Sequence, residues 1–78
     1  MTVKLHGIKH IYIKSEYIKL DSLLKLACFA STGGEAKIYI LGGDVFVNGE
    51  LCVSRGKKIR HGDIVRFGRN ILLVKQTA

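Results

Sequence analysis

The segment SRGKKIRHGDIVRFGRN holds the densest group of side chains suited to binding an anion. Six Lys and Arg residues fall within its fifteen positions from Arg55 to Arg69. Arginine binds phosphate oxygens through a bidentate fork, and lysine acts as a mobile point charge. We therefore expect phosphate contacts from a loop between strands, made by Arg55, Lys57, Lys58 and Arg60. The alternative is a solvated edge strand whose lysines deter aggregation.

A second candidate is ASTGGEAKIYI, residues 30–40, where two glycines and a lysine stand at the start of an expected helix. A nucleotide-binding P-loop requires Lys directly after the last Gly and a hydroxyl residue next. Here Lys37 lies three positions past Gly34, so that interpretation fails. Thr32 and Glu35 instead match a capping box, which predicts a tight turn between two helices. Whether the glycines also contact a phosphate is left open.

Other catalytic or metal-binding constellations are not indicated. His6 and His10 lie four apart in a strand-like segment without a nearby acidic or cysteine partner, and His61 stands in a turn. No serine or cysteine is paired with a predicted base. We therefore expect no enzymatic activity, no metal and no cofactor. Cys28 and Cys52 lie in apolar runs and are interpreted as small core residues rather than as a disulfide.

The charge is large and unevenly distributed along the 78 residues. The chain carries 13 Lys and Arg against 6 Asp and Glu, a net charge of +7. Residues 1–20 have a net charge of +3, residues 21–54 of −2, and residues 55–78 of +6. Such segregation is typical of proteins that bind polyanions. The N-terminus lacks the apolar run of a signal peptide, and no segment is long enough to span a bilayer, so a cytoplasmic protein is expected.

The residue periodicity predicts a single α+β domain. Residues 2–19 alternate, with Ile11 and Ile13 on one face, and indicate one or two short strands with a turn near residues 6–7 or 15–16. Apolar residues at helical spacing predict a helix over 22–30 capped by Asp21, and a second helix over 34–41. Turn signals, among them Asn48-Gly49, then divide a meander into further strands. These cover residues 45–47, 51–53, 64–67 and 71–74, and we expect both helices to pack on one small antiparallel sheet.

Several of these motifs together resemble the S4 RNA-binding domain, whose pattern is roughly R-L-D-x-x-L, S-R-x-x-A-[RK], G-x-V-x-V-N-G and G-D-x-[IV]. The corresponding stretches are KLDSLL, STGGEAK, GGDVFVNG and HGDIV. The similarity is greatest to the small stand-alone bacterial S4 proteins, the YaaA/YbcJ-like group. It implies an S4-like (alpha-L motif) domain over residues 18–75, with residues 1–17 as an N-terminal strand extension.

The resemblance also implies which residues contact RNA. Lys19 stands where the family has Arg before Leu-Asp, Lys37 is the basic residue after Ala, and Arg55 follows the Asn-Gly hairpin. Two positions depart from the pattern, since Gly33 replaces an arginine and Ser22 a frequent basic residue. We hypothesise that the loop over 55–60 compensates. The expected RNA-binding residues are Lys19, Lys25, Lys37, Arg55, Lys57, Lys58 and Arg60.

The function expected from these observations is non-catalytic binding of structured RNA, ribosomal or transfer RNA among the candidates, by a monomer that associates with the ribosome or a ribosomal subunit. The alternative is an adaptor that docks its basic face on an acidic or ribosomal protein. Tyr12 and Tyr17 are candidates for stacking on bases, whereas Tyr39 is expected in the core between helices. Duplex DNA is disfavoured because neither short helix carries a basic row.

Overall fold

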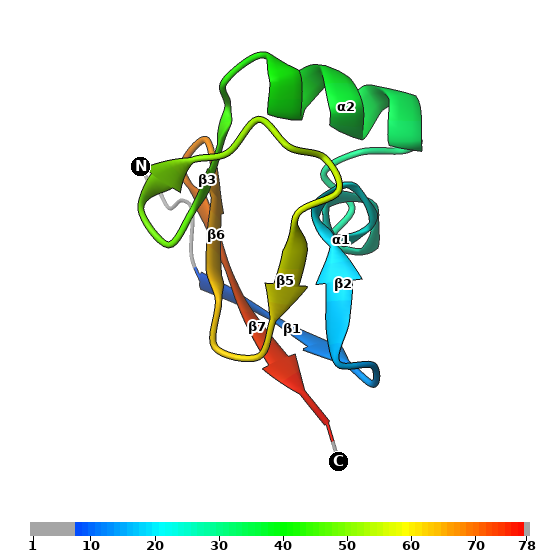
Figure 1. Cartoon of the computed structure of the whole chain (residues 1–78), viewed down its shortest axis with the longest axis vertical. Coiled ribbons are helices and arrows are strands. Elements are labelled where there is room, and N and C mark those ends of the chain that lie inside the picture. The colour runs from blue at the N-terminus through cyan, green and yellow to red at the C-terminus, as the bar shows by residue number, and fades with distance from the viewer. Residues whose placement is uncertain (1–7, 78) are drawn as a thin grey trace, which may run out of the picture.

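The computed structural model of the chain describes residues 8–77. Within them, two short helices pack against a five-stranded sheet and a separate two-stranded ribbon (Figure 1). The α+β class is as expected. The elements in chain order are β1 (Ile8–Ile13), β2 (Tyr17–Lys19), α1 (Leu20–Leu26), α2 (Gly33–Leu41), β3 (Val45–Val47), β4 (Glu50–Leu51), β5 (Lys58–Arg60), β6 (Ile64–Phe67) and β7 (Asn70–Gln76).

The larger sheet is mixed rather than wholly antiparallel. Its order is β1-β7-β6-β3-β4, and β1 runs parallel to β7 from the pair Ile8 and Ile71 to the pair Ile13 and Gln76. The other pairs in this sheet are antiparallel. The alternation expected in β1 is confirmed, with Ile11 and Ile13 buried between exposed neighbours. The expected turn near residues 15–16 separates β1 from β2, whereas the one near residues 6–7 lies outside the described residues.

Helix α1 begins earlier and ends earlier than the periodicity predicts. Asp21 is not its N-cap; that position is Lys19, whose side chain makes no capping hydrogen bond. The first free N–H groups instead donate to the distant loop before β5, from Leu20 to the carbonyl of Lys57 at 2.9 Å and from Asp21 to that of Arg55 at 3.1 Å. The loop therefore satisfies donors that a local side chain usually caps.

Because α1 ends earlier than predicted, one cysteine lies outside the helix. Cys28 adopts φ 66°, a left-handed conformation that an α-helix does not continue through. Its thiol is exposed, so the prediction of a core residue is wrong at this position. Cys52 is partly buried and packs against the core, as expected. Both cysteines are free.

Helix α2 has the capping predicted for it. The hydroxyl of Thr32 accepts a hydrogen bond from the backbone N–H of Glu35 at 3.0 Å. The carboxylate of Glu35 accepts one from the N–H of Ser31 at 2.8 Å, one residue before the usual position. The helix begins at Gly33, and Gly43, with φ 86°, follows its C-cap. The glycine-rich stretch is therefore the connection between two helices.

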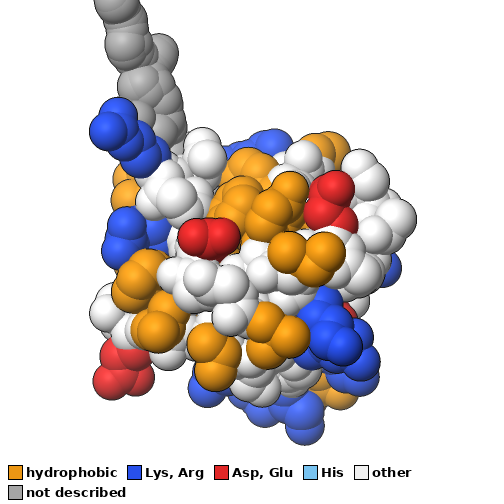
Figure 2. Space-filling model, turned by 90° about the horizontal axis from the view of Figure 1, so that it is seen from above, with side chains coloured by type: hydrophobic (Ala, Val, Ile, Leu, Met, Phe, Trp, Pro, Cys, Tyr) orange, Lys and Arg blue, Asp and Glu red, His pale blue; other side chains and the backbone are white. Residues whose placement is uncertain are grey.

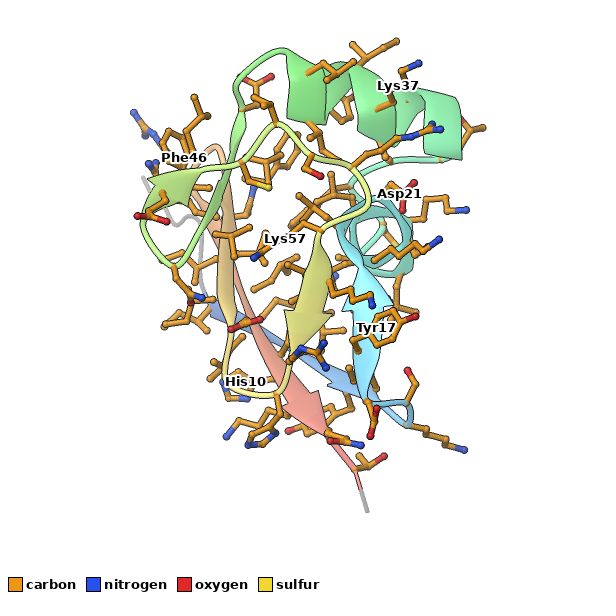
Figure 3. All side chains as sticks on the ribbon, in the orientation of Figure 1. His10, Tyr17, Asp21, Lys37, Phe46 and Lys57 are labelled. Atoms are coloured by element: carbon orange, nitrogen blue, oxygen red, sulfur yellow. The ribbon has the colours of Figure 1, made fainter. Side chains whose placement is uncertain are left out.

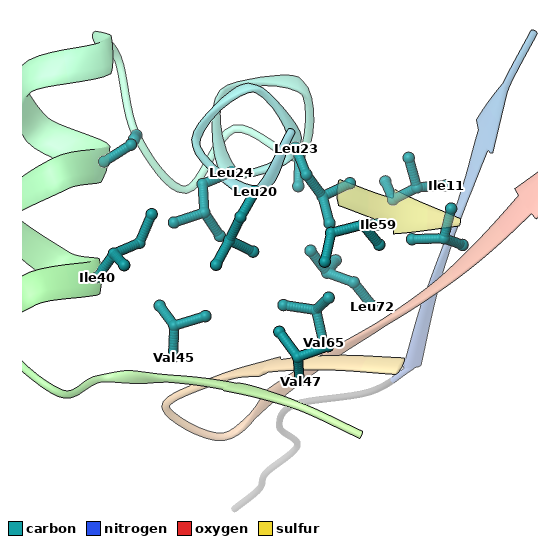
Figure 4. Close-up of a cluster of buried hydrophobic side chains, with 14 of the residues drawn as sticks. Ile11, Leu20, Leu23, Leu24, Ile40, Val45, Val47, Ile59, Val65 and Leu72 are labelled. Carbon is teal, nitrogen blue, oxygen red and sulfur yellow. The ribbon is translucent and has the colours of Figure 1, made fainter. Parts of the chain in front are cut away.

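The core lies between the helices and the inner faces of both sheets. Leu20 and Leu24 of α1 lie on the side of Ile40 of α2, and Leu23 lies on the side of Ile59, with Val45, Val47 and Val65 of the strands beneath them (Figure 4). Tyr39 is half-buried, with its ring centroid 4.9 Å from that of Phe67, as expected for a core residue. The largest side chains with essentially no exposure are Leu20, Leu23, Leu24, Ile40, Val45, Ile59, Val65, Leu72 and Val74.

Two turns of the meander are joined through Asn48. As predicted, Asn48 and Gly49 have positive φ values, 52° and 87°, which suit a hairpin turn. The Asn48 amide donates to the Asp63 carboxylate at 3.1 Å and accepts from the N–H of Ile64 at 2.9 Å. The second oxygen of Asp63 accepts from the N–H of Arg60 at 2.8 Å. The Asn-Gly and Gly-Asp motifs thus fix β5 and β6 relative to β3.

Candidate nucleic-acid interface

The two-stranded ribbon of β2 and β5 presents a basic outer face. In its antiparallel register Tyr17 lies opposite Arg60 and Lys19 opposite Lys58, while Ile18 and Ile59 form the middle pair. Ile59 is fully buried and Ile18 packs against the core, so the ribbon is held by its inner face. Directly opposed side chains share a face of a sheet. We call the four outer side chains, Tyr17, Lys19, Lys58 and Arg60, the basic ribbon.

The electrostatics of the basic ribbon are one-sided. Lys19 and Lys58 are exposed and directly opposite each other, an arrangement that destabilises a sheet because the charges repel. Arg60 adds a third cation, and none of the six residues paired in the ribbon is acidic. The Tyr17 ring lies among these charges, with the Lys58 ammonium 4.9 Å and the Arg60 guanidinium 5.6 Å from its centroid. The ribbon thus concentrates positive charge around one aromatic ring.

The loop before β5 brings a further cation to the start of α1. The carbonyls of Arg55 and Lys57 accept hydrogen bonds from the first residues of α1, and the N–H of Lys57 donates to Ser54 at 3.2 Å. The Arg55 side chain is exposed at this junction. The Lys57 side chain extends to the side of β5 that faces away from Tyr17 (Figure 3). Adjacent lysines therefore point to different surfaces.

The two remaining predicted residues stand on the helices. Lys25 is exposed in the last turn of α1, and Lys37 is exposed on α2. Figure 3 places Lys37 at the α2 end of the molecule, apart from Tyr17. Its helix also carries exposed apolar side chains, Ile38 at 70 % and Leu41 at 56 % exposure. In the view onto α2, hydrophobic side chains occupy much of the surface and basic ones gather toward its margins (Figure 2).

The structure thus assembles Lys19, Lys58 and Arg60 into one face with Arg55 nearby. Lys57 extends to the other side of β5, and Lys37 lies on α2, apart from Tyr17 (Figure 3). Neither strand β5 nor the place of Tyr17 in this face was predicted from the sequence. A signal for both is present in the repeated pattern of Tyr17-Ile18-Lys19 and Lys58-Ile59-Arg60. Each triplet has one apolar residue between two polar or aromatic ones, the alternation of a half-buried strand.

Within residues 8–77 other kinds of site are not evident. No three His, Cys, Asp or Glu side chains are grouped as metal ligands, and no pocket opens on the surface of this part of the chain. His6, one of the pair considered as metal ligands, lies outside the described residues. His61 is exposed in its turn, where its Nδ1 accepts a hydrogen bond from the N–H of Gln76 at 2.9 Å. Neither helix of this region is long and apolar enough to cross a membrane.

The fold and the basic ribbon define a small α+β domain with a cationic face beside its first helix. The sequence model of the S4 domain family matches residues 11–75, and the chain belongs to that family. The resemblance inferred from the motifs is therefore confirmed. The chain is also similar to a protein of Bacillus subtilis (strain 168) named "Probable ribosome maturation protein RlbA". The two are 42 % identical over 57 residues, which cover 73 % of this chain and 80 % of that protein.

Proposed function

We propose that the chain is a non-catalytic module that binds structured RNA, chiefly through phosphate contacts made by the basic ribbon. The observation that carries the proposal is the direct opposition of Lys19 and Lys58, with Arg60 beside them and no acidic partner in the ribbon. Facing like charges cost free energy in the free protein. A phosphate bound between them replaces that repulsion with two attractions, so the arrangement favours a polyanion.

The seven proposed RNA-binding residues divide into an inner and an outer group. Lys19, Lys58 and Arg60, with Arg55 at the start of α1, are near enough in the fold to contact one stretch of backbone. Arg55 and Arg60 supply bidentate contacts, and the lysines supply mobile charge. Lys25, Lys37 and Lys57 are proposed as outer contacts with RNA that extends past the ribbon. All seven lie in the S4-like domain that we propose over residues 18–75.

The RNA that fits this proposal best is ribosomal. Support comes from the name of the Bacillus subtilis relative, which refers to ribosome maturation. Within the S4 family, a module with an exposed basic face and no pocket in the described residues is suited to holding folded RNA rather than to altering it. We propose that the chain acts as a monomer on a ribosomal subunit in the cytoplasm.

The test is to titrate a fluorescent, structured ribosomal RNA fragment with the protein and to measure the affinity by fluorescence anisotropy at several salt concentrations. If about 4–6 phosphates are neutralised, log affinity falls against log salt with a slope of roughly −3 to −5. A slope near zero would contradict phosphate binding. Co-sedimentation with ribosomes before and after complete RNase digestion separates RNA binding from protein docking. Retention after digestion would favour the adaptor.

Neighbouring lysines provide a matched pair of variants for the same titration. Lys58→Glu reverses a charge on the basic ribbon, and we expect about a tenfold loss of affinity because one phosphate contact disappears. Lys57→Glu makes the same chemical change on the other side of β5, and we expect a loss of about threefold or less from the reduced net charge. Equal effects would show that RNA does not distinguish the two sides.

A further inference from the structure

Tyr17 occupies an unusual position for a surface tyrosine. It lies on the outer face of the ribbon, where its ring is half-buried and part of it remains open to solvent. Two cations of the partner strand approach the ring, Lys58 at 4.9 Å and Arg60 at 5.6 Å from the centroid. The ring and the phosphate-binding charges therefore belong to one cluster, also seen around the labelled Tyr17 in Figure 3.

The cations lying near the ring can leave it when RNA binds. Lys58 and Arg60 are exposed, and their long side chains reach solvent without disturbing the core. Exposed cation–π contacts are weaker than the stacking of a base on an aromatic ring. Movement of the two cations onto phosphates uncovers the ring for a base. The free protein thus keeps the ring occupied and the charges positioned until RNA replaces the contacts.

We propose that Tyr17 stacks on an unpaired base of the bound RNA, while Lys58 and Arg60 hold the phosphates on either side of that nucleotide. This inference rests on the proposed function and specifies its substrate as RNA with a bulged or looped-out nucleotide beside a helix. Bases inside a continuous A-form duplex are stacked on one another and cannot reach an aromatic side chain. An unpaired nucleotide presents both a free base and a flexible backbone, which matches a ring surrounded by cations.

The other two tyrosines lack this combination. Tyr12 is 59 % exposed on β1 and lies in register with Lys75, but within residues 8–77 the cations found over aromatic rings do not include one over Tyr12. Tyr39 packs against Phe67. Tyr12 is therefore a matched control, an exposed strand tyrosine in the larger sheet, for any variant of Tyr17.

The test compares two RNA hairpins that differ only by one bulged 2-aminopurine nucleotide. We expect the unaltered protein to prefer the bulged hairpin by at least about fivefold, the lower range of base–aromatic stacking, and to change the 2-aminopurine fluorescence on binding. Tyr17→Leu should lose the preference, so that its affinities for the two hairpins become equal. Tyr17→Phe, which keeps the ring, and Tyr12→Leu should both retain the preference.

The outcomes separate this proposal from the one on which it rests. If neither hairpin binds, the proposed RNA-binding function fails. If both bind equally, or if Tyr17→Leu keeps the preference, RNA binding stands and the stacking site is overturned. Circular dichroism checks that Tyr17→Leu is folded; if it is not, the absence of a preference in the unaltered protein, or its loss in Tyr17→Phe, would still overturn the stacking site.

Discussion

Two regions of the molecule present groups suited to phosphate, and they do so in different ways. The basic ribbon places Lys58 and Arg60 beside one aromatic ring, adds Lys19 on the same face and contains no acidic residue. The turn into α2 offers two glycines, with Lys37 one helical turn further on, and it includes the carboxylate of Glu35. The first region depends on charge brought together by strand pairing. The second depends on the backbone at a helix start.

The difference shows why a glycine-rich helix start does not by itself make an anion site. At α2 the N–H of Glu35 donates to Thr32, and the carboxylate of Glu35 adds negative charge beside the free donors. Ile38 and Leu41 then place apolar surface on the same helix. In the general S4 pattern an arginine occupies the position of Gly33. We propose that the ribbon supplies phosphate contacts in place of the arginine missing from this turn.

The largest effect is expected from removing the side chain that holds the ribbon to the core. Ile59 is fully buried beneath it, so Ile59→Ala should destabilise the protein by about 2–4 kcal/mol through lost burial and a cavity. Ile38→Ala, at a position 70 % exposed on α2, should change stability by about 0.5 kcal/mol or less. Thermal or urea denaturation measures both. A large loss in Ile38→Ala would mean that the α2 surface is structurally engaged.

The next largest effect is expected from reversing two charges, either on the ribbon or on the two helices. Lys19→Glu with Lys58→Glu reverses two charges on the ribbon, and we expect about a hundredfold loss of RNA affinity at moderate salt. Lys25→Glu with Lys37→Glu makes the same change in net charge on the helices, where we expect a loss of about fivefold. Anisotropy titrations at one salt concentration give the ratio. A ratio of one would assign the binding to net charge alone.

Much of the fold was predictable from the sequence because its signals are local. The cap of α2 requires only Thr32 and Glu35 three residues apart, and the hairpin at Asn48-Gly49 requires only two residues that accept positive φ. The spacing of Leu20, Leu23 and Leu24 was sufficient to place the buried face of α1. The cap, the hairpin and the buried face each depend on residues within a few positions of one another, so a local sequence pattern predicts them.

The features that sequence analysis missed depend on distant partners. Helix α1 begins at Leu20 because the carbonyl of Lys57, far along the chain, accepts its N–H. The parallel pairing of β1 with β7 joins the two ends of the described chain. Strand β5 is short and has one apolar residue, Ile59, so its alternation is a weak signal until it is compared with that of its partner β2. The basic ribbon also depends on pairing between residues far apart in the sequence. Its three cations were therefore predicted, but not that they share one face.

The smallest expected effect is a gain in RNA affinity when a positive charge is added at the turn into α2, which tests whether RNA approaches this turn. Gly33 is the first residue of α2, and a Cβ atom added there would lie in open space, so a side chain can begin at this position without a clash, and we choose Gly33→Arg. Arginine favours the helix over glycine, while its charge near the helix start opposes this in part. One added phosphate contact should raise RNA affinity about threefold and make the salt slope steeper by up to about one unit.

Gly33→Ala provides the control, because it changes the helix propensity without adding charge. An increase in RNA affinity that both variants share would come from a more stable helix and not from a new phosphate contact. If Gly33→Arg binds no better than Gly33→Ala, RNA does not reach the turn, and Lys37 beside it loses its proposed role. A gain confined to arginine would show that the turn still faces the RNA, and that this chain lacks only the charge there.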